Sequence, residues 1–84
     1  MKVVYVVYIL ECKDGTLYTG STVDLDKRLQ EHNELKRGAR YTKMRRPVKL
    51  LYKENFKTYG QARAREAEIK RMERGEKISL IKKT

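Results

Sequence analysis

The stretch VVYVVYIL at Val3–Leu10, followed by KDGTLYTG at Lys13–Gly20, decides the fold of this chain of 84 residues. The first run is β-branched and aromatic throughout, which is typical of a strand buried on both faces. Asp14-Gly15 supplies the positive-φ positions that a hairpin turn needs. The β-rich pattern then resumes and stops at Gly20. Together the two runs predict a β-hairpin.

A helical pattern follows the hairpin. Three residues recur on one side at positions i, i+4 and i+7: Leu25, Leu29 and His32. Thr22 or Asp24 can cap the start of this helix. Residues 34–47 are polar and basic and contain Gly38 and Pro47, which predicts a loop with at most a short helix.

The last third of the chain predicts one more strand and a long helix. Val48–Phe56 alternates well enough to form a strand. Thr58 provides an N-cap for a helix that runs to about Glu73, with Gly75 as its C-terminal stop. A short amphipathic tail with apolar residues at 78, 80 and 81 is expected to dock on the body. The predicted order is β-β-α-(loop)-β-α-α, an α+β fold in a single domain, residues 1–84.

The charge balance points to a polyanionic partner. Twenty-one Lys and Arg against eleven Asp and Glu give a formal net charge of +10, which favours nucleic acid first and an anionic membrane surface second. The longest apolar run is far shorter than the ~20 residues of a membrane helix, and it does not read as a signal peptide. Cys12 alone offers neither a disulfide nor a zinc cluster. We therefore expect a cytoplasmic protein, with no membrane role and no evident obligate protein partner.

A one-sided basic stretch runs from Lys36 to Lys57 and is opposed only by Glu54. Such a run is ordinarily a solvated loop, but it repels itself without a partner, so it also predicts contacts to nucleic-acid phosphates. The candidate nucleic-acid-binding residues are Lys36, Arg37, Arg40, Lys43, Arg45 and Arg46.

Polar side chains also occur where the helical period predicts a core. Arg28 shares the side of Leu25 and His32 on the first helix, and Glu66 lies in line with Ala62 and Ile69 on the long helix. An inward carboxylate needs an Arg or a metal ion as its partner. From spacing alone, an Arg28–Glu66 bridge between the two helices is the more common explanation. By the same reasoning His32 is more often a packing residue.

Taken in order, these residues resemble the GIY-YIG nuclease superfamily. The first signature matches at Val6-Val7-Tyr8 and the second at Tyr18-Thr19-Gly20. The segment Asp24–Asn33 follows where that family has its Arg-bearing helix, and Glu66 matches the family's metal-binding glutamate. Each signature is a weak triplet, whereas the ordered set is specific.

The resemblance covers essentially the whole chain and is closest to the small stand-alone members. These carry a similar Gly38–Thr42 loop and a similar Arg45–Val48 segment before the third strand. The sequence departs from the family name at Val6, which replaces the first-motif glycine, and at Thr19, which replaces the second-motif isoleucine. Neither change removes a chemically active group. The resemblance implies a small three-stranded antiparallel sheet flanked by helices.

The family's chemistry is phosphodiester hydrolysis with one divalent metal ion, Mg²⁺ or Mn²⁺. By resemblance Glu66 holds the metal, Arg28 grips the scissile phosphate, and Tyr8 is the general base. Tyr18 then positions the water or the phosphate, and His32 hydrogen-bonds the phosphate or assists proton transfer. Since a free tyrosine has a pKa of ~10, nearby cations or the metal must help Tyr8.

Two functions of different classes remain open at this point. The first is a metal-dependent endonuclease that acts on DNA, favoured over RNA, in repair or processing. The alternative is a non-catalytic nucleic-acid-binding module on the same scaffold. A third interpretation, a membrane-surface or ribosome-associated basic protein, rests on charge alone and ranks last.

Overall fold

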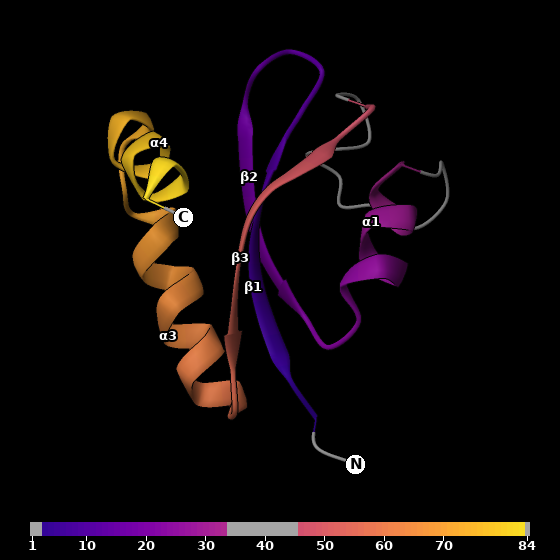
Figure 1. Ribbon diagram of the computed structural model, residues 1–84, viewed down its shortest axis with the longest axis vertical. Helices are drawn as coiled ribbons and strands as arrows, with labels where there is room; N and C mark the ends of the chain where they lie inside the picture. The colour runs from indigo at the N-terminus through magenta and orange to yellow at the C-terminus, as the bar shows by residue number, and fades with distance from the viewer. Residues whose placement is uncertain (1–2, 34–45, 84) are drawn as a thin grey trace.

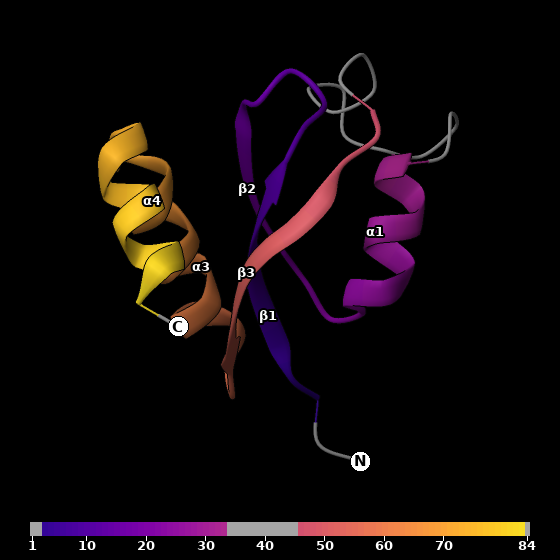
Figure 2. The ribbon, with the colours of Figure 1, turned by 45° about the horizontal axis from the view of Figure 1, so that its top comes forward.

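Three strands and three helices make up the computed structural model, which describes residues 3–33 and 46–83. In chain order they are β1 (Tyr5–Glu11), β2 (Leu17–Thr22), α1 (Leu25–Asn33), β3 (Lys49–Phe56), α3 (Tyr59–Lys70) and α4 (Arg74–Lys82). The strands form one antiparallel sheet in the order β2-β1-β3. Helix α1 covers one face of the sheet, and α3 and α4 cover the other (Figures 1 and 2). The predicted α+β fold and element order are confirmed. None of the described helices is long and apolar enough to cross a membrane.

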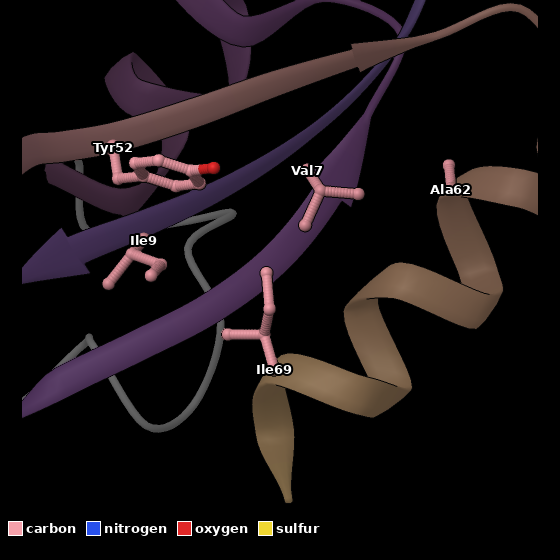
Figure 3. Packing of buried hydrophobic residues seen from close by; sticks show 5 residues of the cluster. All are labelled: Val7, Ile9, Tyr52, Ala62 and Ile69. Atoms are coloured by element: carbon pink, nitrogen blue, oxygen red, sulfur yellow. The ribbon is translucent and has the colours of Figure 1, made fainter. Parts of the chain in front are cut away.

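The central strand β1 supplies the core on both faces. Val7 and Ile9 pack against Ile69 of α3 on one side of the sheet (Figure 3), whereas Tyr8 and Leu10 belong to the cluster beneath α1. All four β1 residues are buried, because successive strand side chains point to opposite faces and both faces carry helices. The prediction of a strand buried on both faces is confirmed.

The edge strand β2 is longer than its sequence pattern predicts. Its pairing with β1 continues past Gly20 to Thr22, which lies opposite Val6. The predicted stop at Gly20 is therefore wrong, because backbone pairing with a long central strand outweighs the weak strand preference of glycine. The extension places Ser21 on the strand, next to Gly20.

The two C-terminal helices correct a second boundary. Thr58 caps α3 as predicted, with its side chain accepting a hydrogen bond from a backbone N–H of the helix. The helix ends at Lys70 rather than near Glu73, however, and Gly75 lies in the first turn of α4 instead of stopping α3. The physical reason is a capping box between Glu73 and Glu76, which starts a new helix.

Helix α1 is fixed over the sheet at both ends. Asp24 is its N-cap, because Asp24 Oδ1 accepts a hydrogen bond from the backbone N–H of Lys27 at 3.1 Å. At the other end the Asn33 amide bonds both backbone groups of Val48, at 2.8 Å to the N–H and 3.2 Å to the carbonyl. These contacts hold the face of α1 that carries Leu25, Leu29 and His32 against Tyr8 of β1.

Candidate functional site

A hydrogen-bonded cluster on the α1 face joins three of the predicted site residues. Tyr8 Oη lies 3.0 Å from His32 Nε2, and the Arg28 guanidinium also hydrogen-bonds the Tyr8 hydroxyl. Because arginine can only donate, the tyrosine oxygen accepts the bond from Arg28. In the bond between Tyr8 and His32 the tautomer sets the direction: His32 Nε2 accepts from the Tyr8 hydroxyl when the imidazole proton is on Nδ1.

Tyr18 of β2 completes this cluster through its ring. The Tyr18 ring meets the His32 ring edge-on, with centroids 5.0 Å apart, and its centroid lies 6.4 Å from that of Tyr8. Edge-on packing of aromatic rings is favourable and fixes their orientation. The structure thus brings together four residues that are 24 positions or less apart in sequence: Tyr8, Tyr18, Arg28 and His32.

Burial sets the protonation states of the Tyr8–His32 pair. His32 is fully buried, and this burial, together with the positive charge of Arg28, lowers the pKa of the imidazole to about 4. Burial also raises the pKa of Tyr8 to about 12, although the hydrogen bond from Arg28 opposes the rise. At neutral pH both side chains are therefore uncharged.

The buried imidazole predicts a pH dependence of stability. With a pKa near 6.5 in the unfolded chain and about 4 in the fold, His32 takes up a proton on unfolding between these values. The free energy of unfolding should be highest above pH 6.5 and fall as the pH drops, by about 3 kcal/mol between pH 7.5 and 4.

Urea unfolding at the two pH values measures this difference. His32→Gln is the matched control, because it retains a polar side chain but does not titrate, and His32 is the single histidine of the chain. The pH difference in unfolding free energy should shrink by about 3 kcal/mol in the variant. An equal pH dependence in both proteins would refute the assignment of a neutral, buried His32.

Gly20 leaves the space that the Tyr8 hydroxyl fills. The two residues are opposite each other on β1 and β2, and a Cβ at position 20 would lie 2.5 Å from Tyr8 Oη and 2.7 Å from Cζ. The tyrosine ring cannot withdraw, because it is buried and packed against the His32 ring. Absence of a side chain at position 20 is therefore a requirement of the cluster.

Gly20→Ala should consequently destabilise the protein by about 1–3 kcal/mol, the usual cost of overpacking a filled core. Gly60→Ala is the control, since a Cβ at Gly60 meets nothing within 4 Å and alanine is the better helix former. Thermal or urea unfolding of the two variants should move in opposite directions. A Gly20→Ala protein as stable as the parent chain would contradict the packing argument.

Glu66 lies on α3, on the opposite face of the sheet, and is only 7% exposed. Ser21 Oγ donates a hydrogen bond to its Oε1 at 2.7 Å, and Lys70 Nζ lies 2.8 Å from Oε2. Arg63 Nη1 is 3.6 Å from Oε1. Burial alone would raise the pKa of the carboxyl, but the hydrogen bonds from Lys70 and Ser21 outweigh it and hold the pKa below its usual value. Glu66 is therefore a carboxylate at neutral pH.

The edge strand links the two faces. Gly20 and Ser21 are consecutive on β2, so one position meets Tyr8 and the next bonds Glu66 on the other side. The negative charge of Glu66 also helps to raise the pKa of Tyr8. Tyr8, Tyr18, Arg28 and His32 therefore lie on the α1 face of the sheet and Glu66 on the α3 face, and β2 contacts both groups.

The alternative of an Arg28–Glu66 bridge between the helices is wrong. Arg28 pairs with Glu31 at 3.3 Å and with Tyr8, whereas the partners of Glu66 come from α3 itself and from β2. The reason is topological, because α1 and α3 lie on opposite faces of the sheet (Figure 1).

The donor set around Glu66 fits a hydrated divalent ion. Within residues 3–33 and 46–83, no three His, Cys, Asp or Glu side chains lie close enough together to hold a metal ion, which argues against a closed protein cage. Mg²⁺ instead commonly uses one or two carboxylates, several waters and substrate phosphate oxygens. The Glu66 carboxylate borders a hollow of about 100 Å³ lined by Arg63, Ala67 and Lys70, which leaves room for such ligands.

Two contacts of Glu66 were not predicted from the sequence. The sequence pattern singles out neither Ser21 nor Lys70 as a partner of Glu66. The sequence does contain a hint of each contact. Lys70 lies four residues after Glu66 on the same helix, which is the spacing of a helical ion pair. Ser21 follows Gly20 on β2, so the two positions face opposite sides of the sheet. The Ser21 contact still required knowledge that α3 packs beside β2.

The predicted nucleic-acid contacts are for the most part not described by the structure. Lys36, Arg37, Arg40, Lys43 and Arg45 lie outside the described residues. Arg46 is described, and its guanidinium donates to the backbone carbonyls of His32 and Glu31 at the end of α1. This side chain therefore has a structural role in holding the helix end, beside any contact to phosphate.

Comparison with known proteins agrees with the motif resemblance. The GIY-YIG catalytic domain family matches residues 4–79. The chain is 60% identical to a UPF0213 protein of Syntrophus aciditrophicus over 90% of this chain and 87% of that protein. It is 52% identical to a UPF0213 protein of Staphylococcus saprophyticus over 89% and 90%.

A solved structure shares the fold as well. The solution NMR structure of the UPF0213 protein BH0048 from Bacillus halodurans aligns with a TM-score of 0.62 and 42% identity, covering 94% of this chain and 83% of the other. Family match, relatives and structure all extend over most of the chain. The chain therefore belongs to the GIY-YIG family of nuclease catalytic domains, together with its UPF0213 relatives.

Proposed function

We propose that this protein is a divalent-metal-dependent endonuclease that hydrolyses phosphodiester bonds in DNA during repair or processing. The observation that carries the proposal is the convergence at Gly20 and Ser21. The Tyr8–Arg28–His32 cluster meets the first of these residues, and the Glu66 carboxylate bonds the second. Phosphodiester hydrolysis needs a base, a cation for the phosphate and a hard oxygen ligand for the metal, and this edge supplies all three.

Arg28 is the proposed ligand of the scissile phosphate. Its planar guanidinium can bond two non-bridging oxygens at once and always carries its charge. Glu66 would hold the metal, Mg²⁺ or Mn²⁺, through a carboxylate oxygen that faces the hollow beside Lys70. When bound, this ion supplies a Lewis acid that stabilises the charge developing on the phosphate oxygens.

The proton path runs through Tyr8 and His32. A phenol with a pKa of about 12 is ionised in only about one molecule in 10⁵ at pH 7, so Tyr8 alone is a poor base. We propose that Tyr8 Oη takes the proton of the attacking water while its own proton passes to His32 Nε2. The water oxygen bonds to phosphorus, the bond to the leaving oxygen breaks, and the leaving alkoxide takes a proton from solvent. His32 then returns its extra proton to Tyr8 Oη, which releases one proton to solvent. The products are a phosphomonoester and an alcohol.

Substrate binding would make this relay easier. The positive charge of Arg28 is, after burial, the main cause of the low pKa of His32. A phosphate bound to Arg28 neutralises that charge, so the pKa of His32 rises when substrate is present. Tyr18 packs against the His32 ring and is proposed to position the water or phosphate.

The basic stretch supplies the proposed docking surface for the rest of the nucleic acid. Among the residues of this stretch that the structure describes, Lys53 on β3 and Lys57 just after β3 are exposed. Contacts from such residues to phosphates would weaken steeply with salt.

We place the reaction in the cytoplasm, as the single free cysteine, buried Cys12, predicts.

The experiment is a cleavage panel with the purified chain. Duplex, branched, damaged and single-stranded DNA, with matching RNA, are incubated with Mg²⁺, Mn²⁺ or a chelator. We expect cleavage of at least one DNA substrate that requires the metal, and weaker cleavage of RNA. A chain that cleaves nothing while it binds the same substrates with a steep salt dependence would be a binding module, and the endonuclease proposal would fail.

A further inference from the structure

Both oxygens of the Glu66 carboxylate already have partners in the free protein. Ser21 Oγ bonds Oε1 at 2.7 Å, and Lys70 Nζ bonds Oε2 at 2.8 Å from one helical turn further along α3. Arg63 adds a second cation at 3.6 Å, one turn before Glu66. A metal ion at Glu66 therefore competes with these contacts, and most strongly with the two cations.

The three partners differ in how readily they can leave. Ser21 is held by the backbone of β2 and has a short side chain, so its hydroxyl stays with Glu66 as long as the sheet is intact. Lys70 has a flexible four-carbon stem, and its side chain is 53% exposed. Arg63 is 60% exposed and makes the longer contact. Of the two exposed cations, Lys70 makes the closer contact with the carboxylate, and its ammonium can still move into solvent.

We propose that Lys70 is a displaceable counter-cation of Glu66, which neutralises the carboxylate in the free protein and yields Oε2 to a divalent metal ion. The inference rests on the proposed function in taking Glu66 as the metal ligand. Two cations in contact with one carboxylate oxygen repel each other, so metal binding and the Lys70–Glu66 contact compete. Lys70 would thus lower the metal affinity of the free protein.

Mn²⁺ binding tests this exchange without any nuclease assay. The free Mn²⁺ signal in electron paramagnetic resonance is titrated with the parent chain and with Lys70→Met, at constant ionic strength and without nucleic acid. Methionine keeps the helix propensity and most of the side-chain volume. We expect Lys70→Met to bind Mn²⁺ about three- to tenfold more tightly, because a competing ion pair and a nearby positive charge are both removed.

Lys82→Met is the matched control. Lys82 is an exposed lysine in the last turn of α4, so its replacement removes the same net charge from a side chain that is not among the contacts of Glu66. Its Mn²⁺ affinity should stay within about twofold of the parent value, as expected for a screened surface charge. An equal gain in Lys82→Met and Lys70→Met would overturn the inference in favour of a general charge effect.

Glu66→Gln separates this inference from the proposed function. In the Lys70→Met background, Glu66→Gln should abolish the gain in Mn²⁺ affinity. If Mn²⁺ binds the parent chain and Glu66→Gln equally, the assignment of Glu66 as metal ligand fails, and this inference with it. If binding depends on Glu66 but Lys70→Met leaves it unchanged or weaker, the exchange alone is refuted and the proposed function stands. Urea unfolding confirms that each variant is folded.

Discussion

Replacing Glu66 with glutamine is expected to reduce metal-dependent cleavage by at least about 10³-fold, because a charged metal ligand worth several kcal/mol in the transition state is lost. The amide is nearly isosteric, so Ser21 can still donate its hydrogen bond to the side-chain oxygen. The substitution removes the negative charge from the hollow beside Lys70 while it leaves the neighbouring packing of Ala62 and Ile69 in place. Initial cleavage rates with Mg²⁺ and with Mn²⁺ measure the effect.

Glu68→Gln provides the matched control for this loss. Glu68 lies two residues further along α3, is exposed, and pairs with Arg65 rather than with the site. Its replacement removes the same charge and should change the rate less than about twofold, as is usual for a surface ion pair. Affinity for DNA in the presence of a chelator should be similar in both variants. If Glu66→Gln retained the parent rate, the metal site would have to lie elsewhere.

The sequence predicted those parts of the fold that depend on local pattern. The buried run of β1, the Asp14-Gly15 turn and the N-cap at Thr58 all act through neighbours in the chain. Boundaries that depend on pairing or on competition between caps were missed. The end of β2 is set by its partner strand, and the break before α4 is set by Glu73 and Glu76 acting as a capping box.

The candidate site was predictable as a set of residues but not as an arrangement. Helical period showed that Arg28 and Glu66 face inward, yet it could not show that their helices cover opposite faces of the sheet. Spacing therefore favoured a bridge where the structure instead has the pairs Arg28–Glu31 and Glu66–Lys70. The sequence pattern also could not show that Tyr8 lies over Gly20, because that contact depends on the register between β1 and β2.

Tyr8→Phe is expected to lower the cleavage rate by about 10²–10⁴-fold, the usual contribution of a general acid–base group. The hydroxyl is the one atom removed, and with it go the hydrogen bonds to His32 and Arg28. The variant should also lose about 1–3 kcal/mol of stability, because His32 Nε2 is left buried without its donor. Tyr52→Phe is the control, since Tyr52 is a second buried tyrosine on β3 that bonds Glu54 on the other face.

The pH dependence of the rate distinguishes the Tyr8–His32 relay from a lone tyrosine base. A lone Tyr8 with a pKa of about 12 would make the rate rise about tenfold for each pH unit between 6 and 9, because the phenolate fraction rises in that proportion. In the relay the reactive form has a protonated Tyr8 and a neutral His32, and both states persist across this range. The relay therefore predicts a nearly flat profile from pH 6 to 9, with a fall only toward the pKa of His32, and a tenfold slope would exclude it.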